Sequence, residues 1–170
     1  DSAREQVQMW LQRRIQLVAM RTADLNRRAL VPTTMRRNID RMVRFLNAEI
    51  ALIDRRITQS LGAEGGWRDK LALLDGLKGV GMITRAWLIA SLPELGVLDP
   101  RRIAALVGLA PFAVDSGTYR GQRHICGGRP ALRSILYLAA LSASRYDPKL
   151  SQFYRSLLAR GKPKKVALVA

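Results

Sequence analysis

The feature that most constrains the fold of this chain is an apolar repeat that runs through residues 35–61. Its members are Met35, Ile39, Met42, Leu46, Ile50, Ile53, Ile57 and Leu61. Spacings of three or four residues place them on one side of an α-helix, so the repeat predicts a single amphipathic helix of about four heptads. One apolar stripe needs a partner surface, and this helix is therefore expected to pair with another.

A second stripe precedes the first. Helical spacing relates Val7, Leu11, Ile15, Val18, Leu25 and Ala29. Pro32 interrupts the pattern, and Thr33 or Thr34 is expected to cap the second helix. Residues 1–62 are therefore predicted to form a helical hairpin or coiled coil that acts as a connector. Pairing within one chain and pairing between two chains both remain open, and a homo-oligomer formed through this hairpin is among the predictions.

The glycine-rich residues 61–66 are expected to stop the second helix, act as a short linker and precede a C-terminal domain, residues 63–170. Short helices are expected at residues 71–77, 83–92, 99–108, 130–145, 147–161 and 164–170, the last one truncated. Residues 109–129 hold four glycines without a helical period and are expected to form a loop or loose hairpin. Strand-like alternation is absent from the sequence, and the predicted fold class is mainly α.

Charge indicates the class of partner. The 170 residues contain 29 Lys and Arg against 13 Asp and Glu, a net charge of +16. Residues 1–61 carry 12 basic and 6 acidic groups, residues 62–115 carry 6 of each, and residues 116–170 carry 11 basic groups against one acid, Asp147. Such an excess repels itself and favours a polyanionic partner bound by the final third of the chain. Arginine-rich solvated faces are the alternative explanation.

Composition also excludes several classes of protein. A hydrophobic content of 48% supplies a core, so general disorder is not expected. The single cysteine, Cys126, cannot form an internal disulfide and indicates a reducing, intracellular setting. The longest apolar runs, residues 103–109 and 135–141, are far shorter than the roughly 20 residues that cross a bilayer. The first residues resemble neither a signal peptide nor an initiator methionine, so a fragment of a longer protein is expected.

Residues 71–92 have the pattern of a helix-hairpin-helix motif. An apolar residue lies between Gly79 and Gly81, with Lys78 before them and Arg85 in the following helix. Glycines allow a backbone to approach a phosphate closely, and the amides that begin a helix bind anions. Such a motif holds a DNA backbone without reading its sequence, and the alternative is a structural turn between two helices.

Ser116 lies in the basic, glycine-rich serine loop, residues 109–129. Its neighbouring arginines are Arg120, Arg123, Arg129 and Arg133. A serine that attacks a phosphodiester needs an activating base or metal, and the developing charge needs a cation such as Arg. The arginines meet the second need, whereas this sequence offers no clear base, so the residues alone favour a turn-forming serine. His124 and Cys126 lack a second ligand pair, and a zinc site is not expected.

Several blocks between residues 74 and 170 together resemble the C-terminal domain of the insertion-sequence one-ten family of transposases, which is related to the Piv invertases. The matching blocks are residues 77–81 with Thr84 and Ala86, residues 106–111, residues 115–117, the glycine pair before Arg129, residues 132–140 and residues 159–167. The first 61 residues resemble the helical segment that joins the two domains of these enzymes. The resemblance implies that Ser116 forms a covalent 5′-phosphoserine link with DNA, and Thr118 is the alternative if the register is shifted.

The resemblance also implies the partners. An N-terminal RuvC-like domain, absent from these residues, would hold Mg²⁺ through acidic side chains, so no metal or cofactor is expected in this fragment, which alone is expected to be inactive. DNA, both transposon ends and target, and a structured guide RNA are the implied ligands in the bacterial cytoplasm, near the nucleoid. The predicted nucleic-acid contacts are Lys78, Gly79, Gly81, Arg85, Arg120, Arg123, Arg129, Arg133, Lys162, Lys164 and Lys165. A non-catalytic nucleic-acid-binding and oligomerisation module is the alternative function.

Overall fold

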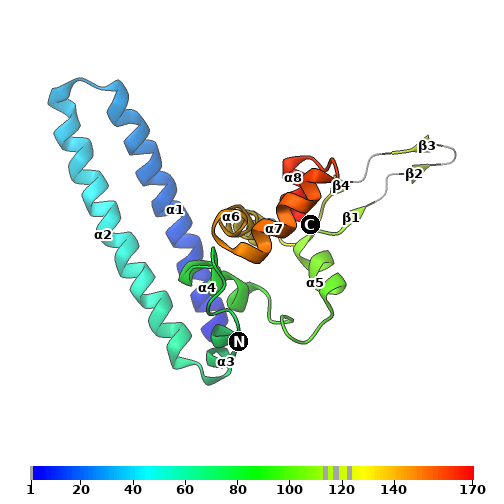
Figure 1. Ribbon diagram of the computed structural model, residues 1–170. Helices are drawn as coiled ribbons and strands as arrows, with labels where there is room; N and C mark the ends of the chain where they lie inside the picture. Colours follow the sequence, from blue (N-terminus) through cyan, green and yellow to red (C-terminus); the bar gives the residue numbers. More distant parts are fainter. Residues whose placement is uncertain (1, 113–114, 117–118, 122–123) are drawn as a thin grey trace. The chain divides into compact units, whose positions relative to one another are not determined.

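The computed structural model describes residues 2–112, 115–116, 119–121 and 124–170. Within these residues the chain forms eight helices and four strands of two residues each (Figure 1). The chain divides into two compact units, Asp1–Lys70 and Leu71–Ala170. The prediction of a mainly α fold that starts with a long helical hairpin is therefore confirmed.

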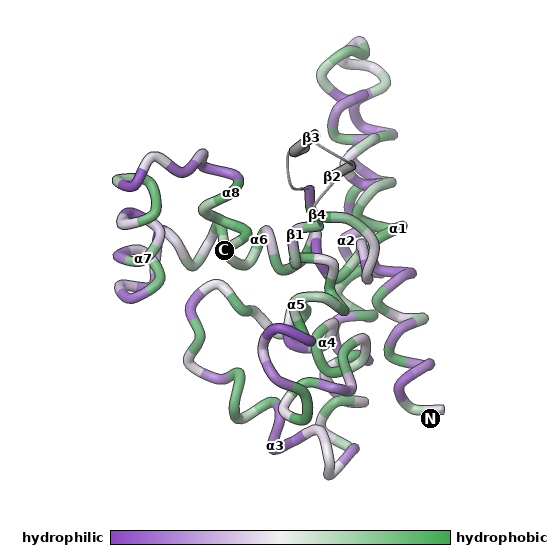
Figure 2. Tube along the Cα trace, turned by 90° about the vertical axis from the view of Figure 1, so that its right-hand side faces the viewer, coloured by the Kyte–Doolittle hydropathy of each residue, from purple (hydrophilic) through white to green (hydrophobic). Residues whose placement is uncertain are grey.

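The first unit is built on α1 (Ser2–Leu30) and α2 (Thr33–Ala63), which run antiparallel and pack side by side (Figure 1). Hydrophobic and hydrophilic residues alternate along both helices (Figure 2). The predicted stripe of α2 is buried from Ile39 to Leu61, because its isoleucines and leucines occupy successive turns on one face. Met35 and Met42, which the repeat placed on that stripe, are 55% and 45% exposed instead.

The stripe predicted for α1 is wrong in its second half. Val7 and Leu11 are fully buried, but Ile15 and Leu25 are 45% and 47% exposed, and Leu17 is buried in their stead. The physical reason is that Arg14, Arg21 and Arg28, spaced by seven residues, take the interface positions that follow Val7 in the same series. A long arginine side chain can pack its aliphatic part on apolar surface while its guanidinium reaches a polar partner, and each of these guanidinium groups reaches one on α2.

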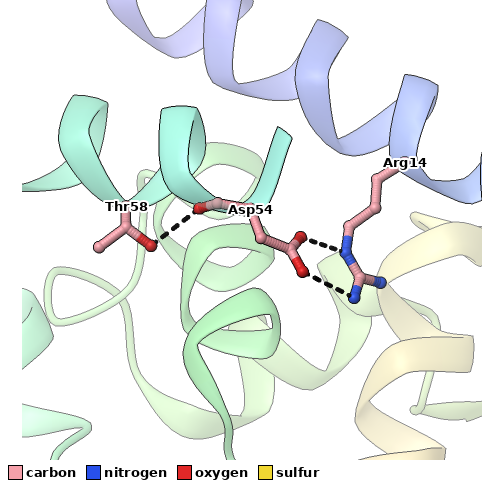
Figure 3. Close-up of polar contacts among 3 residues, drawn as sticks. All are labelled: Arg14, Asp54 and Thr58. Atoms are coloured by element: carbon pink, nitrogen blue, oxygen red, sulfur yellow. Dashed lines mark hydrogen bonds and ion pairs between the residues drawn. The ribbon is translucent and has the colours of Figure 1, made fainter. Parts of the chain in front are cut away.

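Three arginine contacts join α1 to α2 at intervals of one heptad. Arg14 reaches Asp54, Arg21 reaches Asn47, and Arg28 reaches Asp40. The two residue numbers of each contact add up to 68, as an antiparallel pair in constant register requires. Arg14 donates from Nε to Oδ1 at 2.6 Å and from Nη2 to Oδ2 at 3.3 Å, and Thr58 donates Oγ1–H to the Asp54 carbonyl at 2.9 Å (Figure 3). These contacts select one register for the hairpin.

Two local predictions at the ends of α2 are also wrong. Pro32 is the residue that precedes the helix, Thr33 is its first residue, and no side chain caps the α2 N-terminus. The expected linker is reduced to Glu64, because α3 (Gly65–Leu73) begins at Gly65. Trp67 in the first turn of α3 is 7% exposed, and its backbone N–H donates to the Glu64 carbonyl at 3.1 Å. Burial of this large side chain favours helix over the flexibility of two glycines.

The second unit is organised around α6, which packs against α4, α5, α7 and α8. The bounds are α4 (Met82–Ser91), α5 (Pro100–Val107), α6 (Pro130–Tyr146), α7 (Pro148–Ala159) and α8 (Lys164–Val169). Asp99 and Asp147 cap α5 and α7 as their sequences predict, each accepting two backbone hydrogen bonds. Within the described residues, no helix has the length and apolar character needed to cross a membrane.

Between α5 and α6 the chain forms a narrow two-stranded arm instead of a featureless loop. Its strands are β1 (Pro111–Phe112), β2 (Asp115–Ser116), β3 (Tyr119–Arg120) and β4 (His124–Ile125). The pairs β1–β4 and β2–β3 are both antiparallel. The expectation of a loose hairpin is thus met, although the sequence offered no alternation from which to predict strands. We refer to residues 111–125 as the serine arm.

Candidate nucleic-acid interface

The serine arm carries Ser116 to the end of its ladder. At the base, Pro111 pairs with Ile125 and Phe112 with His124. Further out, Asp115 pairs with Arg120 and Ser116 with Tyr119, so that only two residues connect the last paired positions. In Figure 1 the pair β2–β3 lies at the far end of the arm from α5, α6 and the other helices of the second unit. The backbone pairing therefore places the predicted nucleophile in the outermost described pair of the arm.

Pairing along the arm also changes register by one residue. Two residues, 113 and 114, separate β1 from β2, whereas three residues, 121–123, separate β3 from β4. Thr118 and Arg123 lie outside the described residues, and Ser116 and Arg120 are placed here by their backbone pairing. At the base of the arm Phe112 is 51% exposed, and His124 and Ile125 are exposed as well. The described base thus offers aromatic, imidazole and aliphatic groups to a partner.

The two strands of the arm leave the helical core at one compact junction, which we call the arm root: Gly108, Gly127, Gly128 and Arg133. Gly108 ends α5 in the left-handed conformation, with φ +83°. Arg133 Nη1 donates to the Gly108 carbonyl at 3.2 Å and to the Gly127 carbonyl at 2.8 Å. A single guanidinium nitrogen from α6 therefore holds the chain both before and after the arm.

Arg129, predicted to contact nucleic acid, makes three hydrogen bonds to two residues of the protein. Nη1 donates to Glu94 Oε2 at 2.9 Å and to the Ser91 carbonyl at 2.5 Å, and Nη2 donates to Glu94 Oε1 at 2.8 Å. The hydrogen bonds to Glu94 raise the pKa of Arg129 above its ordinary value, so the guanidinium stays charged. This bidentate pair connects the start of α6 to the turn that follows α4.

The helix-hairpin-helix-like turn has its two glycines in different surroundings. A Cβ on Gly79, which has φ +92°, would lie 2.8 Å from Ala139 O and 2.8 Å from Ala143 N in α6. A Cβ on Gly81 would meet nothing within 4 Å. Gly79 therefore allows close packing on α6, whereas Gly81 precedes the exposed first residue of α4, whose N-terminus has no side-chain cap. Lys78 is exposed in the same turn.

Arg85 of α4 stabilises that turn from within. Nε donates to the Val80 carbonyl at 3.0 Å, and Nη1 donates to Asp75 Oδ1 at 2.8 Å. The side chain of Arg85 is only 18% exposed. Among the predicted contacts in this motif, Lys78 and the amides after Gly81 are thus the groups left open to an anion.

A second basic surface lies where α7 turns into α8. Every residue from 160 to 165 is exposed, and the cations of this basic turn are Arg160, Lys162, Lys164 and Lys165. Acidic residues are absent from this segment of the sequence. Exposed cations on a turn suit phosphate backbones, whose charges they neutralise without reading bases.

In the described part of the chain, no three His, Cys, Asp or Glu residues lie close enough together to hold a metal ion. His124 pairs with Phe112 on the arm, and Cys126 is exposed next to the arm root. The described residues therefore do not supply a ligand set for Mg²⁺. The chemistry that they do offer is a serine on an arm, cations for phosphates and open helix amides.

Reasoning from the sequence identified Arg129 and Arg133 as cations for nucleic acid and missed that each also binds the protein. A signal for this was present: the two arginines lie one helical turn apart at the start of α6, directly after Gly127 and Gly128. Arginines that follow a glycine pair can reach exposed backbone carbonyls, which accept hydrogen bonds. Such contacts depend on how distant segments meet, which spacing alone does not reveal.

Comparison with known proteins identifies the family to which this chain belongs. A search of curated protein sequences finds no match. Residues 71–155, half of the chain, match the Transposase IS116/IS110/IS902 family, and the matched segment lies entirely within the second compact unit. It includes the turn around Gly79, the serine arm and both arginines of α6. By this match over α4 to α7, the chain belongs to the transposase IS116/IS110/IS902 family.

Proposed function

We propose that this chain is the serine-bearing part of a DNA transposase in which Ser116 is the nucleophile. Transposases of this family act on DNA, and the chain carries 11 basic groups against one acid from residue 116 onward. The observation that carries the proposal is the pairing of Ser116 with Tyr119 next to a two-residue connection. A nucleophile at the tip of an arm can enter a site formed partly by other domains or subunits.

The proposed step is a transesterification. Ser116 Oγ forms a bond to phosphorus while the bond from phosphorus to the 3′ oxygen breaks, leaving a 5′-phosphoserine link and a 3′-hydroxyl. The serine proton leaves with a base, and the departing 3′ oxygen takes up a proton. Reversal of the step on another 3′-hydroxyl exchanges strands without loss of the phosphodiester energy. Cations near the arm stabilise the charge that develops on phosphate oxygens.

The resemblance to one-ten family enzymes implies that a RuvC-like domain holds Mg²⁺ and completes this site. The described residues do not fit a metal, because no cluster of possible ligands occurs among them. We therefore assign to this chain the nucleophile and the DNA contacts only. A fragment limited to these residues is expected to bind DNA without cleaving it.

DNA binding is proposed for two surfaces. One is the turn with Lys78 and the amides after Gly81, and the other is the basic turn with Lys162, Lys164 and Lys165. Arg120 and Arg123 of the arm complete the set proposed to contact phosphates. The same charges suit a structured guide RNA, and work on genomic DNA would place the enzyme at the nucleoid in the cytoplasm.

The experiment that tests the nucleophile is covalent trapping. The transposase that contains this chain is incubated with Mg²⁺ and DNA of the element ends, and protein linked to DNA is measured. Ser116→Ala is expected to abolish the adduct while DNA binding persists, and Thr118→Val is expected to retain it. Ser134→Ala is the matched control, because that hydroxyl donates to the Pro130 carbonyl within α6. Loss of the adduct in Thr118→Val alone would move the nucleophile to Thr118.

The alternative is a non-catalytic nucleic-acid-binding and oligomerisation module. Exposed apolar residues on α2 support self-association: Met35, Met42, Phe45 and Leu52 are 38–57% exposed and recur at spacings of three or seven. Sedimentation of the 170-residue chain is expected to give a dimer or larger species, and Phe45→Gln is expected to weaken it. An unchanged adduct when Ser116→Ala and Thr118→Val are combined would place the nucleophile elsewhere and leave this chain the role of the module.

A further inference from the structure

We infer that Arg133 is a positioning residue that sets the direction of the serine arm from its root. The inference rests on the proposed function of Ser116, which gives the direction of the arm its importance. Arg133 is the fourth residue of α6, the helix around which the second unit is organised. It belongs to the helical core, yet its hydrogen bonds end on the chain segments that enter and leave the arm.

Both ends of the arm are tied to the same atom. Gly108 lies three residues before β1, and Gly127 lies two residues after β4. Their carbonyl oxygens accept from Arg133 Nη1 at 3.2 Å and 2.8 Å. Because α6 contacts α4, α5, α7 and α8, the guanidinium links this helical core to the arm, whose described strands pair with each other and not with a helix.

Two of the three glycines of the root, Gly108 and Gly128, lie where the junction is too tight for a side chain, whereas a Cβ on Gly127 would meet nothing within 4 Å. A Cβ on Gly108 would overlap Arg133 Nη1 and the Gly127 carbonyl oxygen. A Cβ on Gly128, which has φ +64°, would overlap Gly108 N and would lie 2.6 Å from the Val107 carbonyl carbon. The backbones at Gly108 and Gly128, from which the two sides of the arm start, are thus in close contact. The guanidinium of Arg133 in α6 bridges the same two segments through its hydrogen bonds to the Gly108 and Gly127 carbonyls.

The length of the arm makes its root important. An extended chain of five residue steps, the number from Pro111 to Ser116, spans about 17 Å at roughly 3.3 Å per residue. A rotation of about 10° at the root would move the tip by roughly 3 Å, whereas a misplacement of about 1 Å can cost a reaction on the order of 100-fold. Two-residue strands alone do not resist such a rotation, because short isolated hairpins are marginally stable.

This role separates Arg133 from the cations proposed to bind phosphate. Nη1 of Arg133 already donates to two carbonyls at the arm root. Removal of the guanidinium is therefore expected to loosen the arm and to affect DNA binding little. The expected result of Arg133→Gln is a mobile arm with nearly unchanged DNA affinity. A phosphate-binding arginine would give the reverse: lower affinity, a smaller salt dependence and an arm of unchanged mobility.

The native cysteine provides the measurement. Cys126 is exposed, is the single cysteine of the sequence and lies next to Gly127. A nitroxide on Cys126 of the 170-residue chain reports the motion of the root by electron paramagnetic resonance. Arg133→Gln is expected to raise the mobile fraction at least twofold, and Arg133→Lys to give an intermediate value, since an ammonium lacks the planar donor geometry. Arg155→Gln, an exposed arginine of α7, is the matched control.

A second variant tests the root without removing the guanidinium. Gly128→Ala forces the two backbones apart and is expected to raise the same mobile fraction, with circular dichroism unchanged. If both Arg133→Gln and Gly128→Ala keep the wild-type spectrum, the positioning role is refuted. An effect of Arg155→Gln equal to that of Arg133→Gln would refute it as well, because charge loss alone would then suffice.

Activity separates this inference from the proposed function. In the transposase containing this chain, Arg133→Gln is expected to lower the rate of adduct formation at least 10-fold at saturating DNA, with the DNA dissociation constant within about twofold of wild type. Arg133→Lys is expected to recover part of the rate. If Ser116→Ala still forms the adduct, the proposed nucleophile fails while the mobility result for Arg133 stands. If Ser116→Ala abolishes the adduct but Arg133→Gln keeps the full rate, the inference fails alone.

Discussion

Arg21 of α1 donates Nη1–H to Asn47 Oδ1 of α2 at 3.1 Å, and this contact leaves Nε of the same guanidinium buried without a hydrogen-bond partner in the described structure. One heptad away on either side, Arg14 and Arg28 use Nε to reach an aspartate, at 2.6 Å and 2.5 Å. Asparagine offers a single carbonyl oxygen where aspartate offers two. The central contact of the hairpin is therefore its weakest.

Asn47→Asp is expected to stabilise the first unit. The second carboxylate oxygen can accept from Nε of Arg21, which satisfies the buried donor and repeats the geometry of Arg14 with Asp54. The gain is expected to be about 0.5–1 kcal/mol, the upper range for a partly exposed ion pair. Urea unfolding should show a higher midpoint with an unchanged slope. Asn38→Asp, an exposed substitution on the same helix with the same charge change, is expected to leave the midpoint nearly unaltered.

Asp40 is expected to make the hairpin sensitive to acid. Its hydrogen bond from Arg28 lowers the pKa of Asp40 below the ordinary value of 3.8, with the charges of Arg28, Arg44 and Arg36 acting in the same direction. A carboxyl with a lowered folded-state pKa adds stability above its ordinary pKa and loses it as the pH falls through the lowered value. The difference in unfolding free energy between wild type and Asp40→Asn should be constant above about pH 5 and shrink below about pH 4. A constant difference down to about pH 2 would contradict this.

Gly79→Ala and Gly81→Ala are expected to differ sharply. At Gly79 the added Cβ would lie 2.8 Å from two backbone atoms of α6 in a left-handed conformation, which predicts a loss of roughly 2–4 kcal/mol. At Gly81 the space is open and the backbone is extended, so thermal stability should hardly change. Melting temperatures of the two variants measure the difference. Equal stability would show that the turn does not depend on close packing against α6.

Arg129→Gln is expected to cost stability rather than DNA affinity. The variant loses the bidentate bonds to Glu94 and the bond to the Ser91 carbonyl, for a combined loss of about 1–2 kcal/mol after allowance for solvent, since the two side chains are 35% and 30% exposed. Calorimetry and a DNA-binding titration on the same sample separate the two effects. A large loss of affinity with an unchanged melting temperature would assign Arg129 to the nucleic acid.

The basic turn is expected to show the opposite behaviour. Replacing Lys162, Lys164 and Lys165 together by Gln should leave the melting temperature within about 2 °C, because all three are exposed. The slope of log affinity against log salt should become shallower by about 0.9 for each phosphate of duplex DNA that the variant no longer neutralises. Binding measured from about 50 to 200 mM salt checks this. An unchanged slope would show that these lysines do not face DNA.

Local signals allowed much of the fold to be predicted. Asp99 and Asp147 begin their helices through hydrogen bonds to the backbone two and three residues later, and such contacts are encoded within a few residues. The α2 stripe was equally readable, because its leucines and isoleucines repeat with one period. The α1 stripe was not, since Arg14, Arg21 and Arg28 take interface positions that a search for apolar residues overlooks.

The candidate site was only partly predictable for a related reason. Ser116 and its basic surroundings are evident in the sequence, and the family resemblance gives the serine a role to test. The strands of the serine arm contain two residues each, too few for a period to emerge. Their root depends on α5, α6 and the glycine pair meeting in space, and long-range contacts of this kind leave no local pattern.

The change of register along the arm determines which residue lies opposite Ser116. If the pairing of Phe112 with His124 continued unshifted, Ser116 would face Arg120 across a three-residue connection; the additional residue in the returning chain makes Tyr119 its partner and shortens the connection to two residues. The surroundings of the serine are thus set by the number of residues between β3 and β4 as well as by their identity. Insertion or deletion of one residue there would give Ser116 a different partner while the root and every helix keep their sequence.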